Sequence, residues 1–206
     1  MNSRRVSRRL APLLAGLAAG ALLLSGCSAD PLADQYREGS NKGFIAGDGS
    51  VTEIALADRG EAIAFSGVTE TGETVTSDAL LGEVLVVNFW YASCAPCRAE
   101  ASDLQNLNAQ FENKGASFLG VNVRDQAPNA IAFNETYSVT YPSVLDVDTG
   151  AMQLAFSGSI PPNAVPTTLV LDAEGRVAAR ILGQVTSPSI LETLIQDTIA
   201  ETGPTE

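Results

Sequence analysis

The chain has 206 residues, with 12 lysines and arginines against 24 aspartates and glutamates, so its formal net charge is −12. This acidic balance argues against nucleic acid and other polyphosphate partners, because phosphate binding depends on lysine and arginine. The absence of histidine excludes Ser–His and Cys–His nucleophile pairs, histidine-containing zinc sites and histidine-ligated haem, and a hydrophobic content of 45% is typical of a globular chain of about one domain.

Residues 1–26 have the pattern of a lipoprotein signal peptide. Four arginines come before residue 10, and an apolar stretch of 15 residues follows at Leu10–Leu24. A signal-peptide core needs about 7–15 apolar residues, whereas a membrane-spanning helix needs about 20. The small residues before Cys27 resemble a bacterial lipobox, whose cysteine is diacylated; an ordinary signal peptide with an incidental cysteine is the alternative. We expect an exported bacterial lipoprotein, anchored on the extracytoplasmic face of the cell membrane through Cys27. The export route, Sec or twin-arginine, stays open.

Residues 27–49 are expected to form a flexible tether, and residues 50–206 a single domain. The tether is rich in Gly, Ser, Asp and Asn and has no apolar periodicity. Short strands are then expected at 51–56, 62–65 and 73–76. A continuous apolar run at Val84–Tyr91 indicates a central strand that is buried on both faces.

A helix is expected to begin at the Cys94-Ala95-Pro96-Cys97 sequence and to reach about Lys114, because apolar residues recur there at helical spacing. The later pattern predicts a strand at 118–123, a helix at 128–137, an edge strand at 141–144, a short helix at 152–156, a hairpin of 167–171 with 177–182, and a helix at 187–199. This alternation predicts a mixed sheet between helices.

The three cysteines limit the kinds of site that the chain can form. If Cys27 is lipidated, Cys94 and Cys97 remain as a C-x-x-C pair in an oxidising compartment. A zinc site needs about four Cys or His ligands, and haem attachment needs a histidine where Arg98 stands, so neither a metal nor another cofactor is expected. A structural disulfide across so short a loop would add little stability. We therefore favour a redox-active pair, with a structural bridge as the alternative.

Three motifs together resemble the thioredoxin fold: a strand ending at Phe89–Trp90, a C-x-P-C sequence at a helix start, and Val165–Pro166 before a later strand. The stretch 125–165 resembles the central insert of the TlpA/ResA-type extracytoplasmic thiol–disulfide oxidoreductases. The resemblance covers about residues 51–200. It implies an α/β, thioredoxin-like fold, with a mixed central sheet flanked by helices, an N-terminal β extension and a central αβ insert.

The pattern and the resemblance also suggest catalytic roles. Cys94 at a helix N-terminus, where the helix dipole favours a thiolate, is expected to be the attacking sulfur. Cys97 is then the resolving sulfur. Cytoplasmic thioredoxins usually carry a proton-accepting aspartate where Asn88 stands. In ResA-type proteins a glutamate three residues after the second cysteine does this work, and Glu100 matches it. The alternative for Glu100 is an exposed carboxylate in the first helical turn.

Six residues are expected to contact the client: Trp90, Tyr91, Ala95, Pro96, Val165 and Pro166. Pro166 resembles the cis-proline that faces the C-x-x-C pair in this fold and presents the Val165 backbone to an extended client; a trans proline that opens a strand is the alternative. The family often has tryptophan where Ser93 stands, so Tyr91 is expected to take part of that contact. Trp90 is expected to pack beneath the pair.

Four functions compete. The leading one is a membrane-anchored reductant that keeps apocytochrome c thiols reduced during cytochrome c maturation and receives electrons from a membrane thiol carrier of the CcdA type, which the resemblance implies. The second is an oxidant or isomerase for exported proteins. The third is a thiol peroxidase, although Tyr91 stands where the peroxidatic motif has threonine. The fourth is a redox-silent binding lipoprotein. We expect a monomer.

Overall fold

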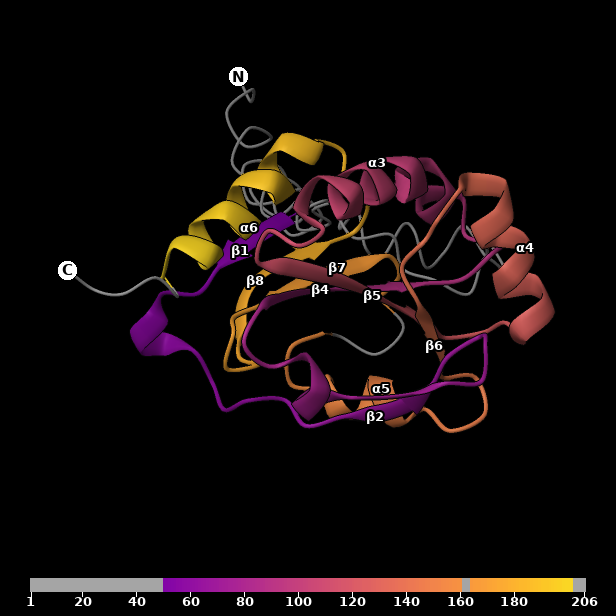
Figure 1. Cartoon of the computed structure of the whole chain (residues 1–206), viewed down its shortest axis with the longest axis horizontal. Coiled ribbons are helices and arrows are strands. Elements are labelled where there is room, and N and C mark those ends of the chain that lie inside the picture. Colours follow the sequence, from indigo (N-terminus) through magenta and orange to yellow (C-terminus); the bar gives the residue numbers. More distant parts are fainter. Residues whose placement is uncertain (1–49, 161–163, 202–206) are drawn as a thin grey trace, which may run out of the picture. The chain divides into compact units, whose positions relative to one another are not determined.

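The main feature of the computed structural model, which describes residues 50–160 and 164–201, is a six-stranded mixed sheet (Figure 1). The strand order is β1–β8–β7–β4–β5–β6. The strands are β1 (Ser50–Glu53), β4 (Val84–Trp90), β5 (Ala116–Asn122), β6 (Ser143–Leu145), β7 (Thr167–Leu171) and β8 (Val177–Leu182). The neighbours β4, β5 and β6 are parallel, whereas β7 is antiparallel to β4, and β8 is antiparallel to β7 and β1.

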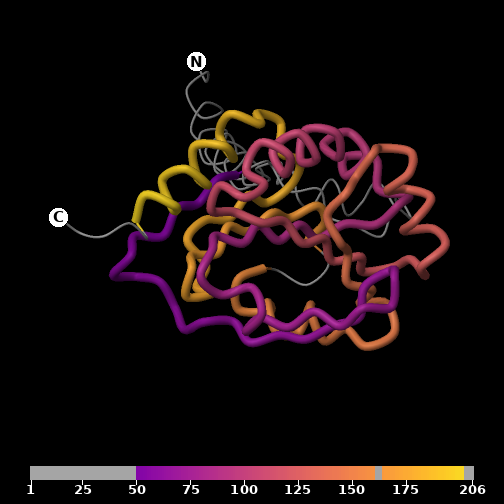
Figure 2. Tube along the Cα trace, in the orientation of Figure 1, coloured from indigo at the N-terminus to yellow at the C-terminus, as the bar shows by residue number. Residues whose placement is uncertain are grey.

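Helices cover both faces of this sheet. They are α3 (Ala95–Phe111), α4 (Ala127–Tyr137), α5 (Ala151–Ala155) and α6 (Pro188–Glu201), with 3₁₀ helices η1 (Leu56–Asp58) and η2 (Ser77–Leu80). In Figure 1, α3 and α6 lie on one face, while α5 lies on the other beside β2 (Ser66–Val68). The trace in Figure 2 shows the same arrangement. The chain therefore has the predicted thioredoxin-like architecture.

The sequence of β4 explains how the two cores form. All seven residues of this strand are buried, as the apolar run predicted. Because successive side chains of a strand point to opposite faces, Val84 and Val86 pack into the core under α3 and α6. Val87 and Phe89 pack into the other core, where Phe89 meets the ring of Phe156 at 5.5 Å between centroids. The strand that leads to the cysteine pair is thus held from both sides.

The N-terminal β extension differs from the prediction in detail. The first strand ends at Glu53, and the strand expected at 62–65 does not form. Ile63 N donates to Gly175 O (2.9 Å) and Phe65 O accepts from Ser77 N (2.9 Å), so these backbone groups have separate partners rather than a strand ladder. The hairpin starts later and consists of β2 and β3 (Thr74–Thr76), which are antiparallel. Phe65 instead packs in the core with Phe156.

The helix that follows the cysteine pair is shorter than predicted. It ends at Phe111 rather than near Lys114. Asn113 adopts a left-handed backbone conformation (φ 57°) two residues after the last helical residue, and a non-glycine residue in that region ends a right-handed helix. The predicted elements within 116–201 all form, with bounds that move by one or two residues at most ends.

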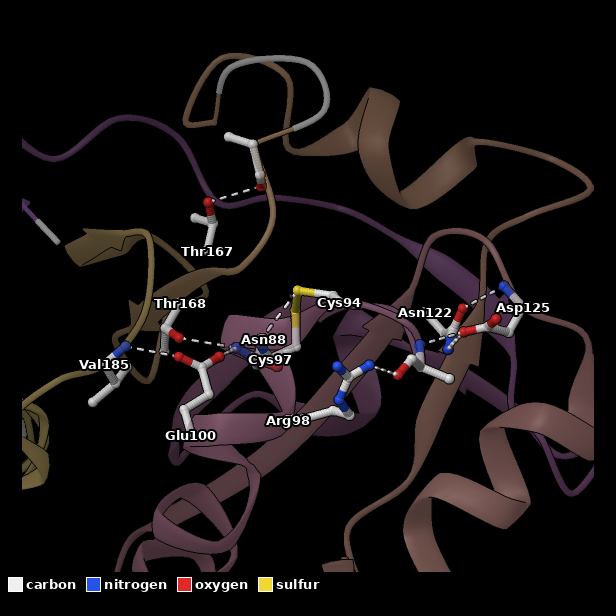
Figure 3. Close-up of a disulfide and its surroundings, with 12 residues drawn as sticks. Asn88, Cys94, Cys97, Arg98, Glu100, Asn122, Asp125, Thr167, Thr168 and Val185 are labelled. Atoms are coloured by element: carbon white, nitrogen blue, oxygen red, sulfur yellow. Dashed lines mark hydrogen bonds between the residues drawn. A yellow bond between two sulfur atoms is a disulfide. The ribbon is translucent and has the colours of Figure 1, made fainter. Parts of the chain in front are cut away.

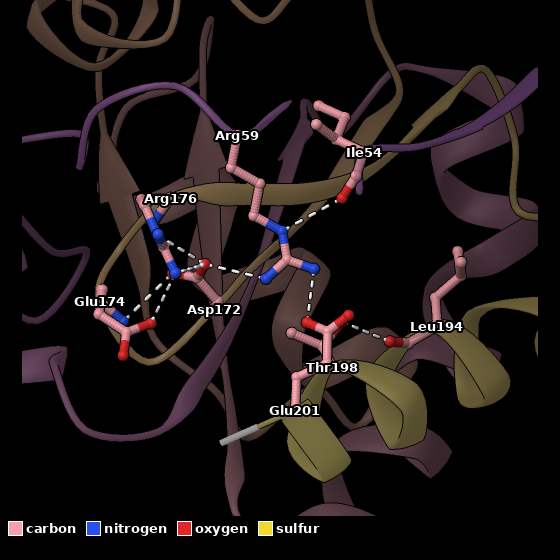
Figure 4. A network of polar contacts seen from close by, with 8 residues as sticks. All are labelled: Ile54, Arg59, Asp172, Glu174, Arg176, Leu194, Thr198 and Glu201. Carbon is pink, nitrogen blue, oxygen red and sulfur yellow. Dashed lines mark hydrogen bonds and ion pairs between the residues drawn. The ribbon is translucent and has the colours of Figure 1, made fainter. Parts of the chain in front are cut away.

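A buried arginine ties the extension to the rest of the domain (Figure 4). The Arg59 side chain is 3% exposed and donates to Asp172 Oδ2 (3.0 Å), to Ile54 O (3.2 Å) and to the Glu201 carboxylate at the end of α6. Asp172 also accepts from Arg176 Nε (2.9 Å) in the turn between β7 and β8. Burial favours the neutral form of Asp172, but hydrogen bonds from Arg176 and Arg59 outweigh it and lower the pKa of Asp172.

We expect Arg59→Ala to lower the free energy of unfolding by about 2 kcal/mol, because Asp172 loses a charged hydrogen bond while Arg176 still partners it. Denaturant unfolding followed by circular dichroism measures this loss. Lys114→Ala is the control, because exposed Lys114 bonds only a carbonyl of its own helix end and should change stability by less than about 0.5 kcal/mol. Equal stability of the two variants would contradict a role for the Arg59 contacts.

Candidate active site at the Cys94–Cys97 disulfide

The two cysteines form a disulfide at the N-terminus of α3 (Figure 3). Cys94 is the N-cap, with extended backbone angles, and its Sγ accepts a hydrogen bond from Cys97 N (3.2 Å). Arg98 N donates to Cys94 O (3.1 Å), which is the first bond of the helix. Pro96 stands in the first turn, where a missing N–H costs nothing. Cys94 therefore stands at the helix N-terminus, as the sequence predicted, and the Cys97 N–H points at its sulfur.

The surroundings of the pair bring together residues that lie far apart in the chain. Cys94 is 0% exposed and Cys97 is 2% exposed, and both belong to one apolar cluster with Val165. The Val165–Pro166 peptide bond is cis, as the resemblance implied. Ala95 is exposed and Pro96 is half-buried, so these two residues form the outer surface of the pair in the oxidised state.

Glu100 lies inside the protein, not on its surface. It is 0% exposed, which excludes the alternative of a solvated carboxylate. Its Oε1 accepts from Asn88 Nδ2 (3.0 Å) and its Oε2 accepts from Val185 N (2.7 Å). Asn88 Nδ2 also donates to Thr168 Oγ1 (3.0 Å), so Asn88 on β4 and Val185 after β8 bond the carboxyl group, and Thr168 on β7 orients Asn88 (Figure 3).

Burial raises the pKa of Glu100 to about 7, against the opposing effect of the hydrogen bonds from Val185 and Asn88. A carboxyl group with a pKa near the working pH can both accept and release a proton. Glu100 lies three residues after Cys97 in α3, on the same side of the helix. The site therefore combines the Cys94–Cys97 disulfide with a buried carboxyl group one helical turn deeper, whose pKa lies near neutrality.

Trp90 and Tyr91 are core residues in this structure. Trp90 packs against the ring of Phe133 (4.2 Å between centroids) and its Nε1 donates to Ser143 Oγ (3.2 Å). Tyr91 is also buried, and the Arg124 guanidinium lies 4.4 Å from its ring centroid. The expected packing of Trp90 beneath the pair is confirmed. The client contact expected of Trp90 and Tyr91 stays a prediction; in this oxidised state both residues are buried.

Asp125, which the sequence analysis did not single out, holds the segment before the disulfide in place through hydrogen bonds. Asp125 Oδ2 accepts from Ala92 N (2.6 Å) and from Asn122 Nδ2 (2.9 Å). On the other side, Arg98 Nη1 donates to Ala92 O (3.3 Å). Asp125 lies 33 residues after Ala92, so no local pattern links the two. Its only signal is position, since it follows the end of a buried strand parallel to β4.

The predictions for the N-terminal part of the chain, namely the signal peptide at 1–26, the lipidation of Cys27 and the tether at 27–49, lie outside the described residues. Across 50–160 and 164–201, no helix combines the length and the apolar character that crossing a bilayer requires.

The Redoxin family matches the chain over residues 55–195. Thiol-disulfide oxidoreductase ResA of Bacillus subtilis is 29% identical over 119 residues, which are 58% of this chain and 64% of ResA. The thiol:disulfide interchange protein DsbE of Allochromatium vinosum is 29% identical over 86% of this chain and 85% of its own length. A crystal structure of a secreted thiol-disulfide isomerase from Corynebacterium glutamicum matches with a TM-score of 0.66 at 31% identity, covering 76% of this chain and 96% of that one.

The match to ResA thus spans less than two thirds of that relative's length, whereas those to DsbE and to the solved structure span most of theirs. The Redoxin match covers well over half of the chain and includes both cysteines, Glu100 and Pro166. The chain therefore belongs to the Redoxin family, and within it to the thioredoxin-like proteins of the TlpA/ResA type.

Proposed function

We propose that the protein is an extracytoplasmic thiol–disulfide oxidoreductase, anchored to the cell membrane through lipidated Cys27, that reduces the disulfide between the paired cysteines of apocytochrome c. The observation that carries this proposal is the Cys94–Cys97 disulfide at the N-terminus of α3 with buried Glu100 one turn below it. The names of the relatives support the thiol–disulfide chemistry. The cytochrome client and a recycling carrier of the CcdA type follow from the resemblance of the sequence to TlpA/ResA-type proteins.

The proposed reaction starts from the reduced form of the protein, in which no bond joins the sulfurs of Cys94 and Cys97. The Cys94 thiolate attacks one sulfur of the client disulfide, so that a mixed disulfide forms and the other client sulfur leaves as a thiolate. Cys97 then transfers its thiol proton to the Glu100 carboxylate, and the Cys97 thiolate attacks Cys94 Sγ. The bond from Cys94 to the client breaks, and the second client sulfur leaves with the electron pair. Two electrons pass to the client, and the membrane carrier returns them to the Cys94–Cys97 disulfide.

We assign recognition of the client protein to the residues around the Cys94–Cys97 pair. Ala95 and Pro96 form accessible surface there, and Val165, next to Pro166, belongs to the same apolar cluster as Cys94. An extended client segment that carries a cysteine fits such a site, because backbone pairing is tolerant of sequence. No cofactor is needed, since the two sulfurs carry the electrons.

The experiment that tests the function is trapping in cells. Cys97→Ser lets the mixed disulfide through Cys94 persist, and the captured proteins are identified by mass spectrometry. Apocytochrome c is the expected adduct, and the double variant Cys94→Ser/Cys97→Ser, which should capture nothing, is the control. Recovery of assorted secreted proteins without cytochrome precursors would overturn the cytochrome client.

One observation favours a second candidate, an oxidant or isomerase for exported proteins. The Corynebacterium glutamicum structure, 96% of which is covered by the match to this chain, is named a secreted thiol-disulfide isomerase. The reduction potential of the Cys94–Cys97 couple separates the two directions of electron flow. A reductant requires a potential below that of the client dithiols, whereas a potential well above theirs would establish the oxidant.

Cys27→Ser is expected to release the protein from the membrane fraction, because the acyl chains that hold it are attached to that sulfur. Fractionation followed by immunodetection measures the release, and incorporation of labelled fatty acid checks acylation directly. The Cys94→Ser variant serves as the control and should stay in the membrane fraction with its label. Membrane retention of unlabelled Cys27→Ser would contradict the lipid anchor.

A further inference from the structure

The turn between β4 and α3 places the attacking sulfur at the start of the helix. It runs from Tyr91 to Cys94, and Cys94 N donates to Tyr91 O (3.1 Å). Its two central residues are Ala92, which is half-buried, and Ser93, which is exposed. No proline restricts the backbone here, and connecting segments at a surface are usually the mobile parts of a domain. The position of Cys94 therefore depends on contacts between this turn and other parts of the chain.

Both backbone groups of Ala92 bond to charged side chains (Figure 3). Its N–H donates to Asp125 Oδ2 (2.6 Å), and its carbonyl accepts from Arg98 Nη1 (3.3 Å). Hydrogen bonds that involve an ionised group are about twice as strong as neutral ones. The bond to Asp125 is the shorter one, and the Asp125 side chain is half-buried, whereas Arg98 is exposed. Asp125 thus makes the stronger of the two contacts.

A buried asparagine holds the Asp125 carboxylate in this position. Asn122 is 0% exposed, and its Oδ1 accepts from Arg124 N (3.0 Å) and from Asp125 N (2.7 Å). Its Nδ2 faces the opposite way and donates to Asp125 Oδ2 (2.9 Å). Asn122 is the last residue of β5, where it pairs with Trp90 at the end of the parallel strand β4. The carboxylate that holds the turn is therefore anchored to the central sheet.

The covalent bond that holds Cys94 in the oxidised state is absent during much of the reaction. The Cys94–Cys97 disulfide ties the turn to α3 in the oxidised protein. In the reduced protein this bond is missing, and in the mixed disulfide Cys94 is joined to the client instead. Its sulfur must nevertheless stay within reach of Cys97. Orientation of reacting groups contributes strongly to rates, and a misplacement of about 1 Å can cost about 100-fold.

We propose that Asp125 and Arg98 are positioning residues for thiol exchange. They hold the N–H and the carbonyl of Ala92, and thereby keep the Cys94 sulfur in place while the disulfide is open. The inference rests on the proposed function. Both residues act through the backbone of the turn, and neither a proton nor an electron passes through them. The role requires the hydrogen bonds to Ala92, which distinguishes it from an effect of the two charges on the Cys94 thiolate.

Two substitutions of Asp125 separate its hydrogen bond from its charge. The bonds from Ala92 and Asn122 both end on Oδ2. In Asp125→Asn the amide oxygen can take that position and accept both bonds. The new N–H₂ then replaces Oδ1, which accepts no hydrogen bond from the described residues. Asp125→Ala removes the acceptor together with the charge. The control is Asp197→Ala, which removes an exposed carboxylate from α6.

The measured quantity is the rate at which Cys94 forms a mixed disulfide with a disulfide-bonded peptide. The full-length parent protein carries Cys97→Ser and is kept in detergent, so that the adduct accumulates, and the rate is recorded as a function of pH. Once Cys94 is fully a thiolate, the rate reaches a plateau that reports the position of the sulfur and not its acidity. We expect Asp125→Ala to lower the plateau about 10-fold, whereas Asp125→Asn and Asp197→Ala stay within about twofold of the parent protein.

Arg98→Met tests the other end of Ala92. Because Arg98 is exposed, this variant should fold as the parent protein does. Its plateau should be about threefold lower, a smaller loss than in Asp125→Ala, since the bond from Arg98 is longer and exposed to solvent. In the double variant Asp125→Ala/Arg98→Met the combined loss should be smaller than the product of the two, because both substitutions release the same turn.

An unchanged plateau in Asp125→Ala, or in Arg98→Met should Asp125→Ala not fold, would overturn the positioning role. An equal loss in Asp125→Asn and Asp125→Ala would also overturn it, because the effect would then belong to the charge. In each of these cases adduct formation by the parent protein would leave the proposed function standing. Absence of any adduct with the parent protein would remove the proposed function, and the positioning role with it.

Discussion

Replacing Cys94 with serine is expected to reduce dithiol–disulfide exchange to the uncatalysed rate. Serine oxygen forms no disulfide, so the first covalent step is lost, and loss of a nucleophile typically costs on the order of 10³-fold or more. Cys97→Ser behaves differently, because Cys94 still attacks and the mixed disulfide accumulates. Rapid-mixing kinetics with a disulfide-bonded peptide, followed by mass spectrometry, separate the two variants: Cys97→Ser should show a single burst of adduct and no turnover.

The two serine variants serve as controls for each other, since both remove the same disulfide and each changes one sulfur to oxygen. Cys27→Ser retains the pair and should exchange at the wild-type rate in detergent. If Cys94→Ser accumulated the adduct and Cys97→Ser did not, the assignment of attacking and resolving sulfurs would be reversed. Full turnover by Cys94→Ser would remove the pair from the mechanism.

Glu100 is expected to make the oxidised protein less stable as pH rises. Its pKa is about 7 in the folded state against 4.5 for an exposed carboxyl group. Below pH 4.5 both states hold the proton, so the contribution of the neutral group is complete. Between pH 4.5 and pH 7 the Glu100 carboxyl group loses its proton in the unfolded state but keeps it in the folded state, which stabilises the unfolded state relative to the folded one. Above pH 7 the contribution of Glu100 to the free energy of unfolding is lost. The free energy of unfolding should fall by about 3 kcal/mol from this group alone.

Denaturant unfolding of the oxidised protein between pH 4 and pH 8 measures this effect, because disulfide-bonded cysteines do not titrate. Glu100→Gln is the matched variant. Asn88 can turn its amide so that Oδ1 accepts from the new N–H₂ and from the Thr168 hydroxyl, which can donate as well as accept. The difference between the two pH profiles isolates Glu100. Parallel profiles would show that Glu100 titrates as an exposed carboxylate does.

Local sequence patterns were sufficient for the main elements of the fold. The apolar run of β4 predicted burial on both faces, and the C-x-P-C sequence marked the start of α3, because strand and helix periodicity act within a few residues. The strand expected at 62–65 does not form: Phe65 and Ile63 pack against the core without joining a ladder, while Ala62 and Ala64 are exposed. An apolar pattern predicts burial more reliably than it predicts hydrogen-bond pairing.

The sequence did not predict which residues surround Glu100. Glu100 could be singled out by its spacing from Cys97, but Thr168 and Val185, which complete its surroundings, lie 68 and 85 residues later in the chain. Their role depends on tertiary packing. Tyr91 is buried, as the apolar run Val84–Tyr91 predicted, whereas the Arg124 guanidinium over its ring comes from the segment after β5 and had no local signal.

The outer edge of β6 is occupied by the N-terminal hairpin of the same chain. Thr69 forms a bridge to Val144, and Glu70 N donates to Ser143 O (3.1 Å) while its carboxylate accepts from Ser143 N. Gly67 permits this approach, because a Cβ there would lie 2.3 Å from a Val144 methyl group. A bare strand edge is a template for strands of other molecules. By covering it, the hairpin protects this edge of the sheet from edge-to-edge aggregation when many copies are crowded together.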